Sequence, residues 1–182
     1  MVYKFSSTSK ITFPGSGIAA IATSLNNLEE IKAQLTYQTI GHDKVNQLRH
    51  VRFFGNIDNM KEHMKKHAAI IRPKFEAVTS ALEKELTPCG IGSWTKPKGG
   101  YFISFDAPEG CAKAIVDRAK KAGVTMTNAG ATWPYGKDPH DSNIRIAPTF
   151  PNLTDLKLAM EIFTTCVRLV SAEKFLKDLS EA

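Results

Sequence analysis

The chain has 182 residues, of which 42% are hydrophobic and 23% are charged, and its formal net charge is +6. This length can bury one good core or two small ones, and the charge content is ordinary for a globular protein. No apolar run approaches the ~20 residues of a membrane-spanning helix. Residues 1–5 do not open a signal peptide, because no hydrophobic region of adequate length follows them.

The first 41 residues have the pattern of an α/β fold. Residues 2–5 are β-prone, and the apolar run at 17–23 predicts a strand buried on both faces. A helix is expected to start at Asn26, which precedes Glu29 by three residues in a box-like cap, and to run toward Gly41. Two strands cannot make a closed sheet. We therefore expect this region to be the remnant of a larger domain.

Residues 42–86 are expected to link two domains. A helical region opens at residues 43–50, and apolar residues then recur at steps of three and four over residues 57–86. This spacing predicts one amphipathic helix, roughly 45 Å long at 1.5 Å per residue. Pro73 lies inside it and should kink it, because the proline ring displaces the carbonyl four residues back.

The run at residues 61–67 is the main concentration of positive charge. It lacks the interleaved aromatic residues that stack bases, so we expect a solvated helix face and no nucleic-acid partner. His63 and His67 have the i, i+4 spacing that can chelate a metal. They lack a glutamate between them and a third ligand nearby, so no metal site is expected.

From Thr87 onward the pattern becomes that of a compact α+β unit. The expected elements are an antiparallel pair at 92–95 and 100–105, a helix at 111–122, strands at 124–127 and 143–147, and a last helix from Asn152 or Thr154 to about Leu179. Three widely spaced cysteines, Cys89, Cys111 and Cys166, lie outside any Cys-x-x-Cys pattern. They indicate reduced thiols in a cytoplasmic protein.

The segment around Lys10 is the first candidate site. Lys10 follows Ser7-Thr8-Ser9 and precedes the turn Pro14-Gly15-Ser16-Gly17. Hydroxyls and the N–H groups of a glycine-rich turn can bind a phosphate. A lysine amine can form a Schiff base with a carbonyl compound when burial or a nearby cation lowers its pKa. Phosphate and aldehyde together suggest pyridoxal phosphate, although common surface turns contain the same residue types.

Arg145 is the second candidate. It stands between Ile144 and Ile146 in a predicted strand, where a guanidinium needs an anion and can hold a carboxylate through two hydrogen bonds. The alternative is an edge-strand arginine paired with Asp141 or Asp138.

These segments, in this order, resemble the C-terminal part of a fold-type-I, pyridoxal-phosphate-dependent aminotransferase of class I/II. The residues of several motifs are similar to those of the alanine–glyoxylate aminotransferase-like subgroup, which also contains bacterial aspartate aminotransferases. The resemblance covers nearly the whole chain. The matching motifs are Ser7-Thr8-Ser9-Lys10, Ile11-Thr12-Phe13-Pro14-Gly15-Ser16-Gly17, the run at 40–50, Gly99-Gly100-Tyr101-Phe102, Ala129-Gly130, Gly136-Lys137-Asp138-Pro139 and Asn143-Ile144-Arg145-Ile146-Ala147.

The resemblance implies an α/β fold: the end of the large cofactor-binding domain at 1–41, linking helices at 42–86 and a small α+β domain at 87–182. It also implies transamination between an amino acid and a 2-oxo acid, of the aspartate or alanine/glyoxylate type, on pyridoxal 5'-phosphate. The complete protein is then expected to be a cytoplasmic homodimer. A catalytically inactive, partner-binding or cofactor-sensing aminotransferase-like domain is the alternative.

The resemblance also assigns roles to single residues. Lys10 would be the catalytic Schiff-base lysine, and Arg145 would clamp the substrate α-carboxylate. Lys44, Asn46 and Arg49 fall where the dimer mate often contributes to the neighbouring active site, although polar residues at a solvated helix start would look the same. The expected cofactor-binding residues are Ser7, Ser9, Lys10, Gly15 and Gly17.

Two departures from the family pattern stand out. The family commonly has a phosphate-binding arginine eight residues after the lysine, and this chain has Ile18 there. The family's N-terminal portion, which carries the aspartate for the pyridine nitrogen and the aromatic residue stacked on the ring, has no counterpart. The chain is therefore expected to correspond to a fragment of such an enzyme.

Overall fold

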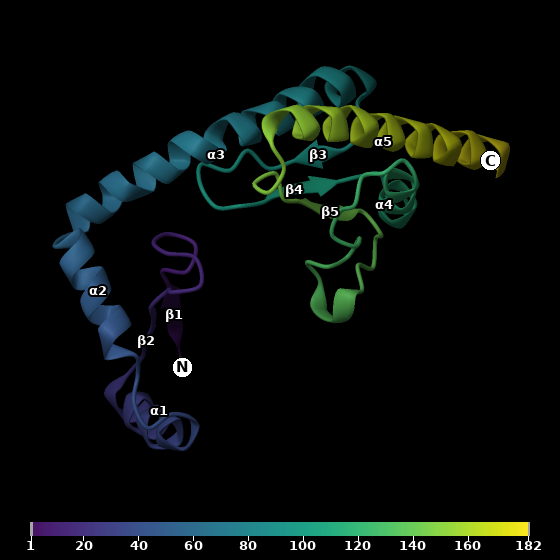
Figure 1. The fold of residues 1–182 in the computed structure, drawn as a ribbon. Helices are drawn as coiled ribbons and strands as arrows, with labels where there is room; N and C mark the ends of the chain where they lie inside the picture. The colour runs from purple at the N-terminus through teal and green to yellow at the C-terminus, as the bar shows by residue number, and fades with distance from the viewer. Residues whose placement is uncertain (1, 182) are drawn as a thin grey trace. The chain divides into compact units, whose positions relative to one another are not determined.

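The structure is a computed structural model that describes residues 2–181. The chain divides into two compact units, Met1–Ala69 and Ile70–Ala182, and the boundary falls inside one long helix, α3 (Figure 1). Within residues 2–181, no helix combines the length and the apolarity that a membrane crossing requires.

The first unit opens with a β-hairpin that carries a long loop. Strand β1 (Lys4–Ser7) pairs antiparallel with β2 (Ala19–Ala22), and Ser7 stands opposite Ala19. Both predicted strands are therefore present, with shifted bounds. The expectation that the second strand is buried on both faces was wrong: within residues 2–181 it pairs with β1 alone, and three of its four side chains are exposed.

Two helices follow the hairpin. Helix α1 spans Leu25–Gln38 and its N-cap is Ser24, so the cap predicted at Asn26 was two residues late. Helix α2 spans Lys44–Phe54. Its first turn is capped by Asp43, whose carboxylate accepts the backbone N–H of Asn46 at 2.8 Å. It ends at Gly55, whose φ of 68° is a left-handed conformation that glycine adopts without strain.

Helix α3 spans Ile57–Leu86 and confirms the long helix predicted from the apolar spacing. Pro73 lies inside it, and the helix continues through the proline. Only the second half of the apolar stripe is deeply buried: Val78 and Leu82 are fully covered, whereas Ile57 is 60% exposed. The stripe is therefore used as core only in the second unit.

The second unit is built on an antiparallel sheet in the order β3 (Ser93–Trp94), β4 (Ile103–Asp106) and β5 (Asn143–Ile146). Helices α4 (Ala112–Lys121) and α5 (Leu153–Glu181) complete it, and short 3-10 turns lie at Thr87–Cys89 and Pro134–Gly136. Figure 1 shows α5 alongside the second half of α3, above the sheet, and one buried cluster joins these helices to β4, β5 and α4.

The α+β pattern predicted for this region is confirmed, with one element missing. Residues 124–127 form no strand, and the sheet ends at β5. Val124 and Met126 are half-buried and pack against the core without a sheet partner. The strand predicted at 100–105 forms only from Ile103.

Candidate active site

Lys10 lies in the loop that connects β1 to β2, and the neck of this loop is closed by Thr8 and Ile18. The Thr8 N–H donates to the Ile18 carbonyl at 2.8 Å, and the Ile18 N–H donates to Thr8 Oγ1 at 2.8 Å. The N–H groups of Ile11 and Thr12 both donate to the Thr8 carbonyl, at 2.8 and 2.9 Å. Lys10 is solvent-exposed on this tight turn.

The predicted phosphate-binding residues meet within this loop. Ser7 Oγ lies 2.8 Å from Ser9 Oγ and accepts the Ser9 N–H at 3.1 Å. Gly17 packs directly against Ser9, because a Cβ at Gly17 would stand 2.7 Å from the Ser9 backbone N and Cα. Gly15 has a φ of 74°. The space beside Gly17 is therefore filled by Ser9, and the two serine hydroxyls and the N–H groups of the glycine turn are donor types that can bind a phosphate group. The Ile18 N–H is already bonded to Thr8.

Two of the three predicted substrate residues on α2 contact the same loop. Asn46 Nδ2 donates to the Ser16 carbonyl at 2.9 Å, and Arg49 Nη2 donates to Asn46 Oδ1 at 2.6 Å. Lys44 is exposed at the start of the helix. A cavity of about 380 Å³ separates the glycine turn from this helix start; its lining is Gly15, Ser16, Gly17, Asp43, Val45, Asn46 and Arg49. Predicted cofactor and substrate residues therefore border one cavity.

Arg145 lies on β5, opposite Ser104 of β4. Its guanidinium carbon stands 4.4 Å from the centroid of the Phe102 ring, and Nη2 donates to Thr127 Oγ1 at 3.3 Å. Its Nε is buried and has no hydrogen-bond partner within residues 2–181. A buried N–H without an acceptor is costly, so this atom is suited to an anionic ligand. Arg145 and Thr127 border a cavity of about 180 Å³.

Neither acid proposed as an alternative partner of Arg145 is paired with it. The Asp138 carboxylate accepts three backbone N–H groups: Oδ1 from His140 at 3.0 Å, and Oδ2 from Ser142 at 2.9 Å and Asn143 at 2.8 Å. Asp141 accepts the Lys113 N–H at 3.2 Å. The edge-strand pairing is therefore wrong, and Asp138 instead shapes the loop that leads into β5.

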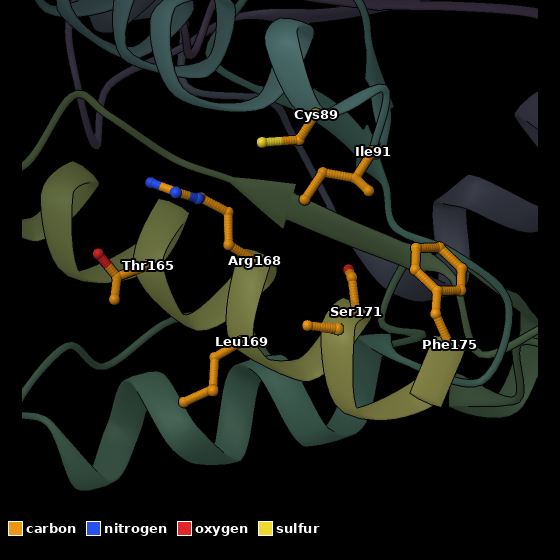
Figure 2. Close-up of a pocket in the computed structure, with 8 residues that line it drawn as sticks. Cys89, Ile91, Thr165, Arg168, Leu169, Ser171 and Phe175 are labelled. Carbon is orange, nitrogen blue, oxygen red and sulfur yellow. The ribbon is translucent and has the colours of Figure 1, made fainter. Parts of the chain in front are cut away.

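A larger cavity of about 570 Å³ lies elsewhere in the second unit, between α5 and the segment that follows α3 (Figure 2). Figure 2 shows Cys89 and Ile91 facing Arg168, Ser171 and Phe175. Arg168 Nη1 lies 3.5 Å from a Glu85 carboxylate oxygen. None of the site residues predicted from the sequence lines this cavity.

Sequence reasoning missed Thr12 and His50. Both are buried, and His50 Nε2 lies 2.8 Å from Thr12 Oγ1 across 38 residues of sequence. The only local signal is the i, i+4 spacing of Asn46 and His50, which places both on one helix face.

The two histidines with metal-binding spacing belong to the aromatic cluster of the first unit. The ring centroids of His63 and His67 are 4.3 Å apart, and His63 Nε2 donates to the Thr12 carbonyl at 3.3 Å. Residues 2–181 contain no group of three His, Cys, Asp or Glu side chains that could hold a metal ion.

The α/β fold, with a lysine on a hydroxyl-rich loop beside a glycine turn and an arginine on the sheet of an α+β unit, has the arrangement expected of the C-terminal part of an aminotransferase. The chain belongs to the aspartate aminotransferase family, whose model matches residues 1–178.

Relatives of known sequence and structure agree with this assignment. An aspartate aminotransferase of Corynebacterium glutamicum is 41% identical over 173 residues, which are 95% of this chain and 40% of that protein. A protein of Mycolicibacterium smegmatis named as a candidate aminotransferase is 48% identical, over 96% of this chain and 41% of that protein. The chain thus spans about two fifths of the length of these relatives.

Solved structures show the same fold. An aspartate transaminase of Corynebacterium glutamicum matches with a TM-score of 0.91 at 41% identity, over 95% of this chain and 41% of that chain. An α-aminoadipate aminotransferase of Thermus thermophilus, complexed with N-(5'-phosphopyridoxyl)-L-leucine, has a TM-score of 0.73 at 18% identity, over 94% of this chain and 43% of that chain. At that identity the likeness concerns the fold alone.

Proposed function

We propose that this chain takes part in pyridoxal-phosphate-dependent transamination between an amino acid and a 2-oxo acid, with Lys10 as the catalytic lysine. The observation that carries the proposal is the Lys10 loop. Its Ser7 and Ser9 hydroxyls lie 2.8 Å apart, and Gly17 packs directly on Ser9, which brings the glycine turn beside these hydroxyls. We propose that Ser7, Ser9, Gly15 and Gly17 hold the cofactor phosphate, with hydroxyls and N–H groups in the place of the family's arginine at Ile18.

Pyridoxal 5'-phosphate, when bound, supplies an aldehyde and an electron-withdrawing ring. The residues of the chain would hold the cofactor, orient the substrate and move its proton. The Lys10 amine would bind the aldehyde carbon and, once released from it, move a proton at the substrate Cα, which requires one amine to serve as both nucleophile and base.

Arg145 would orient the substrate. Its buried Nε and its Nη groups form the planar fork that holds a carboxylate through two hydrogen bonds. Fixing the α-carboxylate directs the Cα–H bond and contributes the positional part of catalysis. Arg145→Lys should raise the KM for every amino-acid substrate, because an ammonium lacks the planar fork of a guanidinium. An unchanged KM would contradict the role of Arg145 as a carboxylate clamp.

The substrate class and the assembly are also proposals. Lys44, Asn46 and Arg49 are suited by charge and amide chemistry to the distal carboxylate of aspartate or glutamate, and two of them line the cavity beside Gly15 and Gly17. The aspartate aminotransferase relatives favour this dicarboxylic class over alanine and glyoxylate. We propose a cytoplasmic homodimer as the active form.

The experiment that tests the proposal is a cofactor-trapping assay. The chain is incubated with pyridoxal 5'-phosphate, reduced with borohydride and mapped by mass spectrometry. We expect the reduced adduct at Lys10 ahead of the other lysines, with the exposed Lys32 of α1 as the internal reference, and no loss of reference labelling in Lys10→Ala. Equal labelling of Lys10 and Lys32 would argue against a cofactor lysine and favour an inactive, partner-binding domain.

A further inference from the structure

His50 is buried on α2 with both ring nitrogens occupied. It is 6% exposed, and Nδ1 lies 2.9 Å from the carbonyl oxygen of Asn46, one helical turn earlier. A carbonyl oxygen can only accept, so Nδ1 carries the hydrogen. In the neutral ring Nε2 is then an acceptor, and the Thr12 hydroxyl donates to it across 2.8 Å. The Asn46 carbonyl thus fixes the direction of the His50 contact with the loop.

Thr12 connects His50 to Thr8, which lies at the neck of the Lys10 loop. Thr12 is 2% exposed, and its Oγ1, whose one hydrogen is directed to His50, lies 3.1 Å from the Thr8 hydroxyl oxygen. The Thr12 N–H donates to the Thr8 carbonyl at 2.9 Å. Thr8 in turn holds Ile18 through two hydrogen bonds of 2.8 Å. Thr8 and Thr12 stand two residues before and after Lys10, so the lysine is bracketed by the residues that His50 holds.

The other end of the loop is held from the same helical turn. Asn46 Nδ2 donates to the Ser16 carbonyl at 2.9 Å. Between the two attachments, the Phe13 ring packs against His50 with centroids 5.1 Å apart, and the Arg49 guanidinium carbon lies 5.2 Å from the Phe13 ring centroid. One turn of α2 therefore contacts the loop on both sides of Pro14.

We propose that Asn46 and His50 form a two-point clamp on residues 8–18, and that His50 is the positioning residue for the Lys10 amine. The catalytic consequence rests on the function proposed above for Lys10, whereas the clamp itself is a property of the loop. His50 does not touch the reacting atoms and acts only through Thr12. If the loop lost this contact, it could shift and carry the Lys10 amine away from the cofactor aldehyde. Misplacing the amine in this way would slow catalysis.

Two pairs of matched variants of the full chain test the clamp. In His50→Asn the amide nitrogen can occupy the place of Nδ1 and reach Asn46, but nothing reaches Thr12. In His50→Gln the amide extends to the place of Nε2 and can still bond Thr12. Thr12→Val removes the hydroxyl with little change of shape, whereas Thr12→Ser keeps it.

The first readout is hydrogen exchange of the backbone amides in residues 8–18, which needs no cofactor. We expect His50→Asn and Thr12→Val to speed exchange of the Ile18 amide roughly tenfold to hundredfold, because each leaves a buried polar group without its hydrogen-bond partner. His50→Gln and Thr12→Ser should stay within about threefold of the parent by the same reasoning. Equal protection in Thr12→Val and Thr12→Ser would overturn the clamp even if the His50 variants failed to fold.

The second readout is the rate of borohydride-trapped labelling of Lys10 relative to the exposed Lys32 of α1. We expect a fall only in the two variants that lose the Thr12 contact. If the parent chain shows no preference for Lys10, the proposed cofactor role fails while the exchange result still decides the clamp. If exchange changes as expected and the labelling ratio does not, His50 shapes the loop without positioning the amine, and the positioning role is rejected.

Discussion

Arg145 and Phe102 form a cation–π pair, with the guanidinium carbon 4.4 Å from the ring centroid. Phe102 precedes β4 and Arg145 lies on β5, so the antiparallel pairing of these strands brings them together. The ring covers one face of the guanidinium while leaving its edge, including the unpartnered Nε, for a ligand. Phe102 therefore restricts the orientation of the proposed carboxylate clamp.

Replacing Phe102 by leucine should weaken substrate binding. An exposed cation–π contact contributes about 0.5–1 kcal/mol, which corresponds to a rise in KM of roughly twofold to fivefold. Phe102→Tyr keeps the ring face and serves as the control. Steady-state kinetics with an amino-acid substrate measure the effect, and equal KM values for the leucine and tyrosine variants would show that the ring face contributes nothing.

Gly17→Ala should disrupt the proposed phosphate-binding loop. Its Cβ would collide with the Ser9 side chain and stand 2.7 Å from the Ser9 backbone, so the loop must shift. Gly15→Ala is the matched control, because its Cβ meets nothing within 4 Å and the substitution costs only the backbone strain of a φ of 74°, about 1 kcal/mol. We expect Lys10 trapping by pyridoxal 5'-phosphate to fall at least tenfold more in Gly17→Ala; a larger loss in Gly15→Ala would contradict the assigned packing.

Asp138→Asn should destabilise the second unit by about 1–3 kcal/mol, because the amide cannot accept all three N–H groups that the carboxylate accepts. Asp141→Asn is the control: Asp141 accepts one N–H, and asparagine tolerates its φ of 44°. Urea unfolding monitored in the second unit measures both variants. A cost for Asp141→Asn as large as that for Asp138→Asn would contradict the role given to the three donors.

The same carboxylate predicts a pH dependence. Burial acts to raise the pKa of Asp138, but the N–H groups of Asn143, Ser142 and His140 together hold it below its ordinary value of 3.8. A lowered pKa in the folded state means that the unfolded chain binds the proton more readily. The contribution of Asp138 is therefore present above pH 3.8 and is lost as the pH falls through the folded value. The stability difference between the parent and Asp138→Asn should shrink over that window, and a constant difference would refute the linkage.

The three cysteines should differ in reactivity. Burial raises the pKa of the Cys111 and Cys166 thiols, whereas Cys89 is exposed. The thiolate is the reactive form, so a thiol reagent at pH 8 should label one cysteine quickly in the folded chain and all three in urea. Cys89→Ser should remove the fast phase. A fast phase that survives this substitution would show that a buried thiol is reached without unfolding.

Much of this structure could be predicted from local patterns. Asp43 and Gly55 mark the ends of α2, the apolar spacing predicts α3, and the residues around Arg145 predict β5. These features depend on interactions between residues that are close in sequence, such as capping, turn formation and the repeat of a helix or strand. The order of Lys10, the glycine turn and Arg145 also indicated the aminotransferase family before any geometry was known.

Other features depended on contacts between distant residues. Strand β2 is exposed because it pairs with β1 alone within residues 2–181, and its own apolar sequence cannot specify how many strands pair with it. The role of Asp138 follows from a loop that turns three N–H groups toward one carboxylate.

The Lys10 loop shows most clearly which features the local sequence determines and which depend on tertiary contacts. The sequence by itself determined the chemistry, an amine among hydroxyls and glycines. The tertiary structure decided how the loop that carries this amine is attached to α2, because the Thr12–His50 contact joins residues 38 apart. Its direction depends on which nitrogen of His50 carries the hydrogen, and the position of the Asn46 carbonyl sets this only once α2 has folded.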